Sequence, residues 1–481
     1  MSLARRSVTS SAYNVTANII QVAVLLGRSI ALARLLTPDL FGIYVFASSI
    51  ISLTRPLAMF GLQGAFLYRT PTGQEEQARR VHFTLMALFG AVWAMILAVT
   101  ALFFAPEVRT ALWVLVGTSY VLLLTQTPRA SLTRNVWFRR LALLQVVTAV
   151  ATTIVAVGMA WRGFGLWSLL ATDMVAAGLA LLLFYGPRPV WRPRLGWSPV
   201  IVRDFLQFGG RVLGGSLLAQ ALDRVDDLWT GVFLGDTALG FYSRAYRFAN
   251  YPRILLAKPL NQVVAGTYAQ LTEDRLRLSR AFFRVNALMV RVNFALAGLL
   301  ALVAPEFIVI ALGARWLPML DAFRLMLVYT LLDPIKITVA SVITASGAPE
   351  KVIHARAIQL GVLLLGLATM GPIWGITGVA IAVDLMLLVG MGILFWQARR
   401  FVDFDLKRLF AIPVLALVVG MVAAWGVIAL AEVPTSPWWT AGVKASVFMP
   451  LFGGLVLLAE RGQIPKLIEP FRQLDLPKGS K

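Results

Sequence analysis

Thirteen of the 44 lysine and arginine residues lie inside long apolar segments, where a charged side chain needs a cavity or a partner. Arg28 follows Gln21 by seven residues and Arg55 follows Tyr44 by eleven, so each pair shares one helical face. The guanidinium group presents a fork of donors that matches the oxygens of phosphate. These residues therefore predict a cationic, tyrosine-lined cavity suited to a phosphate or pyrophosphate group.

A later apolar segment carries a similar stripe at helical spacing, formed by Arg244, Arg247, Tyr251 and Lys258. Pro252 is expected to kink this helix, so the sequence leaves open whether Arg253 belongs to the stripe. Tyr242 and Arg253 are related to Tyr44 and Arg55 by a shift of 198 residues. We therefore place Arg244, Arg247, Arg253 and Tyr242 among the candidate binding residues.

Carboxylates gather in the segment just before this stripe, at Asp223, Asp226 and Asp227. Two interpretations remain open: the carboxylates bind a coupling proton or Na⁺, or they neutralise arginines such as Arg224 and Arg28. Neutralisation is favoured because buried charges need compensation in either case. Asp333 and Lys336 are three residues apart in another apolar segment, which favours an ion pair within one helix.

Several other chemistries are excluded or disfavoured by composition. Cysteine is absent, so the chain has no disulfide, thiolate metal site or thiol nucleophile. The two histidines, His82 and His354, are isolated from each other, and no metal site is expected. Some basic residues near the ends of apolar segments are expected to reach the membrane interface: Arg211, Arg291, Arg324, Lys258 and Lys444.

The elements that position these residues are predicted to be transmembrane helices. The 481 residues are 59% hydrophobic and only 14% charged, which excludes an ordinary water-soluble globule. Segments of about 20 apolar residues are needed to span a bilayer. The chain has about fourteen, near 13–36, 40–60, 81–104, 111–128, 140–161, 164–186, 205–234, 238–260, 282–304, 319–346, 353–371, 373–396, 408–431 and 438–459. In lipid every backbone N–H and C=O group needs a hydrogen-bond partner within the protein, and a helix supplies these partners internally. The sequence therefore predicts an all-α membrane protein.

The distribution of basic residues predicts the orientation of these helices. With a cytoplasmic start, the cytoplasmic segments hold 28 lysine and arginine residues and the opposite loops only three. Both termini are therefore predicted to be cytoplasmic, and the net charge of +21 needs no nucleic-acid partner. Tryptophans beside arginines are expected to be interfacial anchors near anionic lipid, at Trp137, Trp191 and Trp197.

An internal repeat relates the first six predicted helices to the next six. A shift of 198 residues aligns Gly42 with Gly240 in two similar segments, 36–44 and 234–242. The predicted parts are an N-terminal lobe (1–204), a C-terminal lobe (205–400) and two additional helices with a tail (401–481). Repeated halves are typical of secondary transporters that work by alternating access, although duplication can also build a scaffold.

Four stretches carry a resemblance to a known family: LLTPDLFGIY (35–44), DDLWTGVFLG (226–235), LGFYSRAYR (239–247), and APE with LGARW (304–306 and 312–316). With these motifs the chain resembles the polysaccharide-transporter branch of the multidrug/oligosaccharidyl-lipid/polysaccharide (MOP) exporter superfamily, the Wzx-type flippases. The acidic stretch Asp223–Asp227 departs from many relatives, which leaves the coupling ion open.

The resemblance implies two six-helix lobes with two extra helices in a bacterial inner membrane. It implies movement of an undecaprenyl-pyrophosphate-linked oligosaccharide from the cytoplasmic to the periplasmic leaflet, for exopolysaccharide, O-antigen or capsule synthesis. Arg28, Arg55 and the group Arg244, Arg247 and Arg253 would hold the pyrophosphate. Expected partners are this lipid, membrane lipids and other polysaccharide-assembly proteins; no cofactor is expected beyond a coupling Na⁺ or H⁺.

Four alternative functions fit parts of this pattern. A lipid II flippase and a multidrug or cation exporter belong to the same superfamily, and an exporter of cations should carry acidic rather than arginine-rich cavity helices. A membrane polymerase or glycosyltransferase needs a substantial external loop, whereas the longest predicted one has only about fifteen residues. A scaffold subunit should tolerate loss of the deep arginines.

Overall fold

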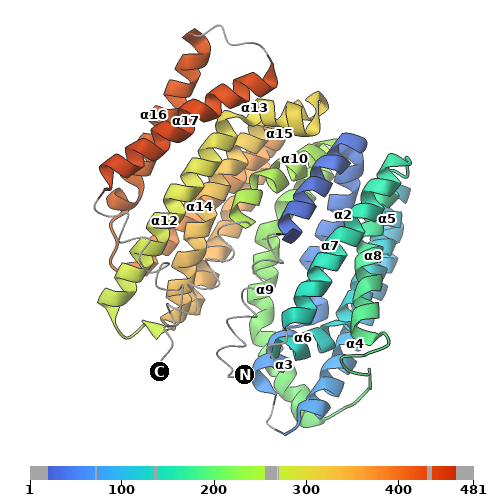
Figure 1. The fold of residues 1–481 in the computed structure, drawn as a ribbon. Coiled ribbons are helices and arrows are strands. Elements are labelled where there is room, and N and C mark those ends of the chain that lie inside the picture. The colour runs from blue at the N-terminus through green and yellow to red at the C-terminus, as the bar shows by residue number, and fades with distance from the viewer. Residues whose placement is uncertain are drawn as a thin grey trace, which may run out of the picture. The chain divides into compact units, whose positions relative to one another are not determined.

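The computed structural model describes residues 20–70, 73–134, 138–254, 268, 270–430 and 436–461, without the side chains of 138 and 139. Within these ranges the chain is helical and contains no strand, which confirms the all-α fold class (Figure 1). Ten helices in this part are long and apolar enough to cross a membrane. The chain separates into two compact units, Met1–Ser243 and Arg244–Lys481.

In the described part of the first unit, a helix over residues 20–35 is followed by eight labelled helices and the start of a ninth. These are α2 (Pro38–Met59), α3 (Leu62–Arg69), α4 (Glu75–Thr100), α5 (Pro106–Leu124), α6 (Gln126–Arg134), α7 (Phe138–Trp161), α8 (Leu166–Tyr185), α9 (Pro199–Leu234) and the start of α10 (Asp236–Ala249). Prolines stand in the first turns of α2, α5 and α9, where a missing N–H costs no hydrogen bond. Phe60, with φ of 41°, ends α2 in the left-handed region, and Gly61 follows it with φ of 64°.

In the described part of the second unit, the rest of α10 is followed by six further α-helices. These are α12 (Arg275–Leu302), α13 (Ala304–Phe307), α14 (Leu320–Ala345), α15 (Pro349–Ala398), α16 (Leu406–Leu430) and α17 (Pro437–Ala459). A π turn (Ile308–Leu312) and a 3₁₀ turn (Ala314–Met319) join α13 to α14. The 50-residue α15 is two helices, because Gly375 breaks the helical backbone with φ of 57° and ψ of −137°.

The predicted spans agree with the observed helices in most places. Spans predicted at 353–371 and 373–396 are the two parts of α15, and nine other predicted spans each overlap one candidate membrane helix. The total of fourteen is not confirmed: the start of the first span lies outside the described residues, and α9 and α10 are absent from the ten. Charged residues in α9, including Asp223, Asp226 and Asp227, make that helix too polar to qualify.

The two compact units divide the chain at a different residue from the predicted lobes. The sequence repeat places a boundary at 204/205, whereas α9 packs against α2 and α3 within the first unit. A repeat boundary marks where a similar sequence begins again, and a packing boundary marks where contacts are fewest. The lobes at 1–204, 205–400 and 401–481 therefore stay a prediction.

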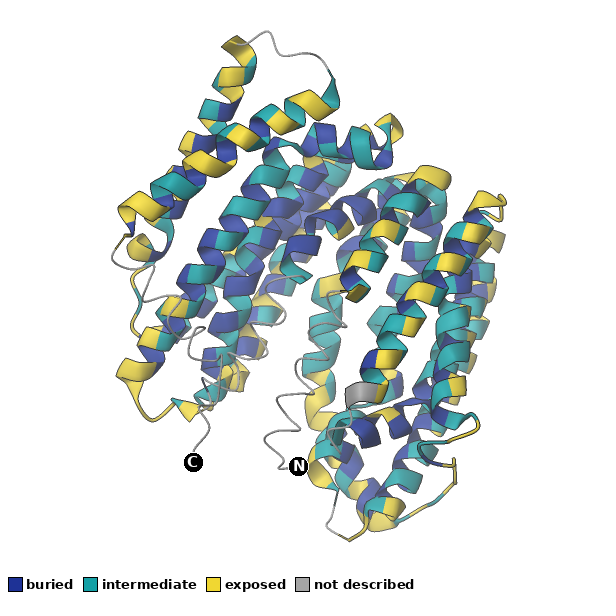
Figure 2. Ribbon diagram, viewed as in Figure 1, coloured by how far each residue is buried: buried dark blue, intermediate teal, exposed yellow. Residues whose placement is uncertain are grey.

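Apolar side chains on the outside of both units are numerous, as expected of helices that face lipid. Exposed large hydrophobic residues form stripes on α4 (Val92, Met95, Ile96 and Val99) and on α16 (Val414, Leu415, Val418 and Val422). Figure 2 shows such exposed residues along both helices of the α16–α17 pair. A water-soluble monomer rarely exposes patches of this kind, so these surfaces fit a bilayer.

The glycine pair of the repeat forms a close helix crossing in the first unit. A Cβ atom on Gly42 would lie 1.8 Å from the backbone oxygen of Asp236, and one on Gly240 would lie 1.9 Å from the backbone oxygen of Pro38. Asp236 is itself the repeat equivalent of Pro38. The starts of α2 and α10 therefore contact each other reciprocally, which only glycine permits at this separation.

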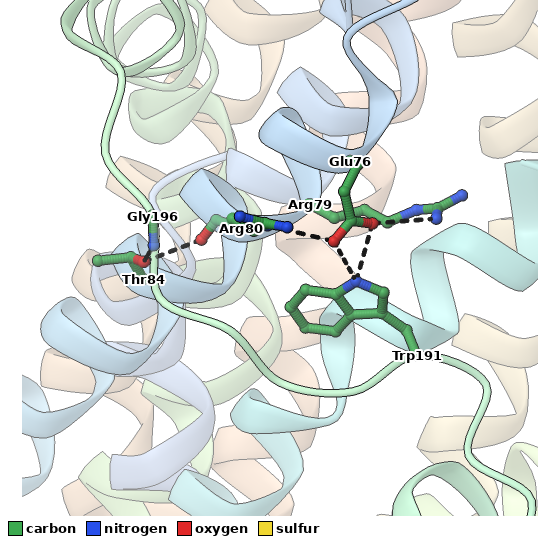
Figure 3. A network of polar contacts seen from close by, with 6 residues as sticks. All are labelled: Glu76, Arg79, Arg80, Thr84, Trp191 and Gly196. Carbon is green, nitrogen blue, oxygen red and sulfur yellow. Dashed lines mark hydrogen bonds and ion pairs between the residues drawn. The ribbon is translucent and has the colours of Figure 1, made fainter.

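A second feature recurs in both units and ties a connecting segment to a helix start; we call it the linker clasp. In the first unit, Trp191 Nε1 donates to both carboxylate oxygens of Glu76, at 3.1 and 3.2 Å (Figure 3). The Gly196 N–H donates to Thr84 Oγ1 at 3.0 Å. Trp191 is buried at 8% exposure, so the expectation that it anchors at the lipid interface is wrong.

In the second unit the linker clasp has the side-chain donor on the helix and the carboxylate on the connecting segment, the reverse of the first unit. Arg275, at the start of α12, donates to both carboxylate oxygens of Asp403, at 2.7 and 3.1 Å. The Asp403 N–H donates to Ser279 Oγ at 2.9 Å. In both units, one side-chain contact and one backbone N–H thus hold the segment after the sixth helix of the repeat to the start of an earlier helix. The two units therefore resemble each other in these contacts as well as in the sequence motifs.

Candidate functional site

Arg28 and Gln21 lie on the helix over residues 20–35, and both are partly buried. Arg28 Nη1 donates to Thr152 Oγ1 of α7 at 3.1 Å. Thr152 is neutral, so this contact orients the guanidinium group through a hydrogen bond. Asn14 and Asn18, on the same predicted helix, lie outside the described residues.

Arg55 lies in the last turns of α2 and is partly buried. Its Nε atom is buried without a hydrogen-bond partner, and no carboxylate within the described ranges pairs with its guanidinium group. The like charge of Arg129, on α6, acts on it. An arginine at the end of a membrane helix, with a second arginine nearby and no acidic partner in the described chain, favours binding of an anion.

The two tyrosines predicted for the cavity each donate to an aspartate. Tyr44 Oη lies 2.8 Å from Asp173 Oδ2 on α8, and Tyr242 Oη lies 2.5 Å from Asp226 Oδ2 on α9. Tyr242 is completely buried. The repeat-equivalent tyrosines thus both donate to aspartates, although these aspartates are on helices that the repeat does not relate, and in this structure both hydroxyl groups are committed to carboxylates.

The acidic residues of α9 have three different environments. Asp227 accepts from Arg224 Nη1 at 3.1 Å and from Ser49 Oγ at 3.0 Å, and it is buried. Asp226 is buried against Tyr242, whereas Asp223 is exposed. The predicted ion pair of the α9 carboxylates with Arg224 is present, at Asp227. This geometry alone does not select between charge neutralisation and ion coupling.

A buried ion-pair cluster surrounds Asp333 on α14. Lys336 Nζ lies 2.7 Å from Asp333 Oδ1, as expected for residues three apart on a helix. Arg253 Nε lies 2.9 Å from Asp333 Oδ2, and the Tyr329 ring lies within 6 Å of both cations. One carboxylate therefore serves two cations, and Arg253 is already partly neutralised.

The remaining predicted residues of the stripe are distributed differently. Arg244 is buried and Arg247 is exposed, both on α10, while Lys258 lies outside the described residues. The helix α10 ends at Ala249, three residues before Pro252, so the backbone does not continue as one straight stripe. Arg253 consequently belongs to the Asp333 cluster.

Two buried ion pairs were missed because their cations were expected at the membrane interface. Arg291 on α12 bonds to Glu460 through Nε at 2.6 Å and through Nη2, and Lys444 Nζ on α17 lies 2.7 Å from Glu306 Oε1. Arg291 and Lys444 are buried, so the expectation of interfacial positions is wrong for both. Their acidic partners are 169 and 138 residues away in the chain, and no local spacing signals the contact.

Carboxylates also gather where α2 and α10 begin. Asp236, outside the membrane helices, is partly buried and lies near Glu107 and Asp39. Burial, followed by the repulsion of these two carboxylates, raises the pKa of the Asp236 side chain above its ordinary value. Protonation of Asp236 therefore stabilises the folded protein, and this contribution is lost as the pH rises through the folded-state pKa.

We expect Asp236→Asn to raise the melting temperature at neutral pH and to have little effect at acidic pH, where Asp236 is protonated. The gain should be modest, a few tenths of a kcal/mol, because solvent screens a group that is only partly buried. Thermal unfolding of the purified protein at several pH values measures it. Asp204→Asn, at a carboxylate near the start of α9, is the control; equal pH dependence of the two variants would contradict the assignment.

Taken together, these observations define a multi-pass helical membrane protein with a repeated architecture and intramembrane arginines, the class to which secondary transporters and flippases belong. The profile of the family described as "Polysaccharide biosynthesis protein" matches residues 31–321. The chain belongs to this family, and the expected place in the MOP superfamily is confirmed.

Individual relatives agree with this assignment. The lipopolysaccharide biosynthesis protein WzxC of Escherichia coli (strain K12) is 20% identical, over 81% of this chain and 80% of WzxC. The succinoglycan biosynthesis transport protein ExoT of Rhizobium meliloti (strain 1021) is 26% identical, over 59% of this chain and 58% of ExoT. The solved structure of the lipid II flippase MurJ, in an inward closed conformation, has the same fold, with a TM-score of 0.77 at 13% identity over 95% of this chain and 100% of MurJ. The protein is a transporter rather than an enzyme.

Proposed function

We propose that the protein moves an undecaprenyl-pyrophosphate-linked oligosaccharide from the cytoplasmic to the periplasmic leaflet of a bacterial inner membrane, by alternating access. The observation that carries this proposal is Arg55, which has no acidic partner in the described chain and has a second arginine, Arg129, nearby. Relatives named for lipopolysaccharide and succinoglycan biosynthesis support a glycan-linked cargo.

The charges near Arg55 indicate which kind of cargo the site suits. Two buried carboxylates on α9, in the same unit as Arg55, are engaged: Asp227 by Arg224 and Asp226 by Tyr242. The charge that Arg129 adds near Arg55 is positive, and no carboxylate in the described chain pairs with Arg55. A cationic site of this kind suits a pyrophosphate and disfavours a cationic drug.

The test is Arg55→Ala, with transport measured in proteoliposomes that carry the lipid-linked oligosaccharide and by polysaccharide export in cells. Removing a charge-assisted contact worth about 1.5–3 kcal/mol should lower transport at least about tenfold. Arg55→Lys should be intermediate, because lysine keeps the charge and loses the planar fork.

The matched control is Arg162→Ala, which removes an equal charge from the exposed turn between α7 and α8. Arg162→Ala should transport normally. Normal transport by Arg55→Ala, at equal protein abundance and melting temperature, would refute the proposed role of this residue.

Transport assays with vesicles that carry different lipids distinguish between related cargoes. Vesicles loaded with lipid II test the lipid II flippase alternative, since that lipid also carries a pyrophosphate. Transport of lipid II with no transport of other lipid-linked oligosaccharides would overturn the proposed cargo, and synthesis of glycan by the purified protein would overturn the transporter assignment.

A further inference from the structure

A groove of about 500 Å³ lies in the second unit, where α12 begins, α14 ends and the chain leaves α15. Its walls include two arginines and two hydroxyl groups, from Arg275, Arg400, Thr272 and Ser346, beside the ring of Phe401. The volume is within the range of ordinary ligand pockets, about 300–1,000 Å³. The groove is far along the chain from Arg28 and Arg55, and no residue of the proposed transport site lines it.

The charges around this groove are predominantly positive. Arg275 is held by the bidentate contact with Asp403, and its Nη2 also donates to the backbone oxygen of Arg399 at 3.2 Å. The guanidinium group of Arg400 has no acidic partner in the part of the chain that the structure describes. Lys351 Nζ lies 4.8 Å from the centre of the Phe401 ring. The lining thus contains two arginines and no carboxylate, and the Asp403 carboxylate engages only Arg275 among the described residues.

The corresponding place in the first unit has a different charge balance, although it carries the same linker clasp. A cavity of about 250 Å³ there is lined by Arg79 and Arg134 together with Glu75 and Glu76. Arg79 lies 3.6 Å from Glu76, and Arg134 lies 3.8 Å from Glu75. Each arginine in that cavity therefore has a carboxylate, so only the groove of the second unit carries excess positive charge.

We propose that the groove of the second unit binds the phosphate of an anionic phospholipid headgroup. Arginine donors with neighbouring hydroxyl groups match the oxygens of a phosphate. The groove lies at the ends of three membrane helices, and the distribution of basic residues predicts that these ends face the cytoplasm. Phospholipid headgroups are located at this depth, and the ring of Phe401 can contact the start of an acyl chain.

The test compares Arg400→Gln with Arg399→Gln in the full-length protein. Both variants lose one charge at adjacent positions, and both side chains are exposed, but only Arg400 lines the groove. The protein is placed in nanodiscs of phosphatidylcholine with and without phosphatidylglycerol. The readouts are the retained phosphatidylglycerol, by native mass spectrometry, and the melting temperature.

We expect Arg400→Gln to weaken phosphatidylglycerol retention about tenfold and to abolish the rise in melting temperature that this lipid produces. Arg399→Gln should behave like the unchanged protein, and Arg400→Lys should be intermediate. Equal losses in Arg400→Gln and Arg399→Gln would show diffuse surface attraction and overturn the site, as would retention unchanged in both.

A second arm identifies the source of the phosphate. Inorganic pyrophosphate is titrated by calorimetry into the detergent-purified protein. Pyrophosphate binding that depends on Arg400, without any preference for phosphatidylglycerol, would show a soluble ligand and overturn the lipid assignment. Arg400 is outside the proposed transport site, so we expect Arg400→Gln to transport at normal rates. The lipid measurements on this variant therefore test the phospholipid site separately from the proposed transport function.

Discussion

Replacing Glu460 by Gln should lower the free energy of unfolding by about 3–5 kcal/mol, because it leaves the Arg291 guanidinium group buried without a counter-charge. Arg291 and Glu460 side chains are only 8% and 1% exposed, so water cannot take the place of the lost carboxylate. Arg291 also donates through Nη1 to the backbone oxygen of Ala287, which restricts its movement toward solvent. The pair joins the end of α17 to the middle of α12.

The measurement is thermal and denaturant unfolding of the purified protein in detergent. Arg291→Met should destabilise by a similar amount, whereas the double variant Arg291→Met with Glu460→Met should recover most of the loss, since neither charge is then left alone. Arg284→Met, on the same helix but exposed, should change stability by less than about 0.5 kcal/mol. Additive losses in the double variant would show that the two residues are not coupled.

Replacing Gly42 by Ala should also destabilise strongly, by about 1–3 kcal/mol, because the new methyl group would meet backbone atoms. The ideal Cβ position is 1.8 Å from the Asp236 oxygen and 2.5 Å from its carbonyl carbon. A side chain could rotate away, but a backbone carbonyl at the start of α10 can be relieved only by separating the two helices. Gly240→Ala meets Pro38 in the same way, so the repeat-equivalent variants should have similar effects.

The control for both glycine variants is Gly117→Ala in α5, where no atom lies within 4 Å of the new Cβ. That change should be neutral or stabilising, by up to about 1 kcal/mol, since alanine favours a helix over glycine. Unfolding in detergent measures all three variants under one condition. A loss in Gly117→Ala equal to that in Gly42→Ala would contradict the proposed close crossing.

Much of the fold could be predicted from local sequence, because apolar length determines where a helix can span a membrane. The predicted span 319–346 matches α14 (Leu320–Ala345), and the span 438–459 matches α17 (Pro437–Ala459). Short helices such as α3 and α6 were missed because eight or nine residues are too few to show a clear apolar period. The sequence predicted two separate spans, 353–371 and 373–396, but did not indicate that the backbone break is at Gly375.

The candidate site was foreseen where its contacts are local and missed where they are distant. The Asp333–Lys336 pair follows from a spacing of three residues on one helix. The pairing of Asp333 with Arg253, and of Tyr44 with Asp173, requires that different helices meet, and their separations in sequence contain no such information. Even the repeat indicated that Tyr44 and Tyr242 are equivalent without indicating that both bind aspartates.

The sequence by itself determined that this is an all-helical, repeated membrane protein with a surplus of basic residues, some of them inside the apolar segments. Those properties depend on composition, on the length of apolar runs and on similarity between two parts of the chain. Only the tertiary structure decided which charges are neutralised: Lys444 and Arg291 have buried carboxylate partners, whereas Arg55 has none in the described chain. The physical reason is that Coulomb energy depends on the distance between charges in space and on their burial, and both arise when helices pack.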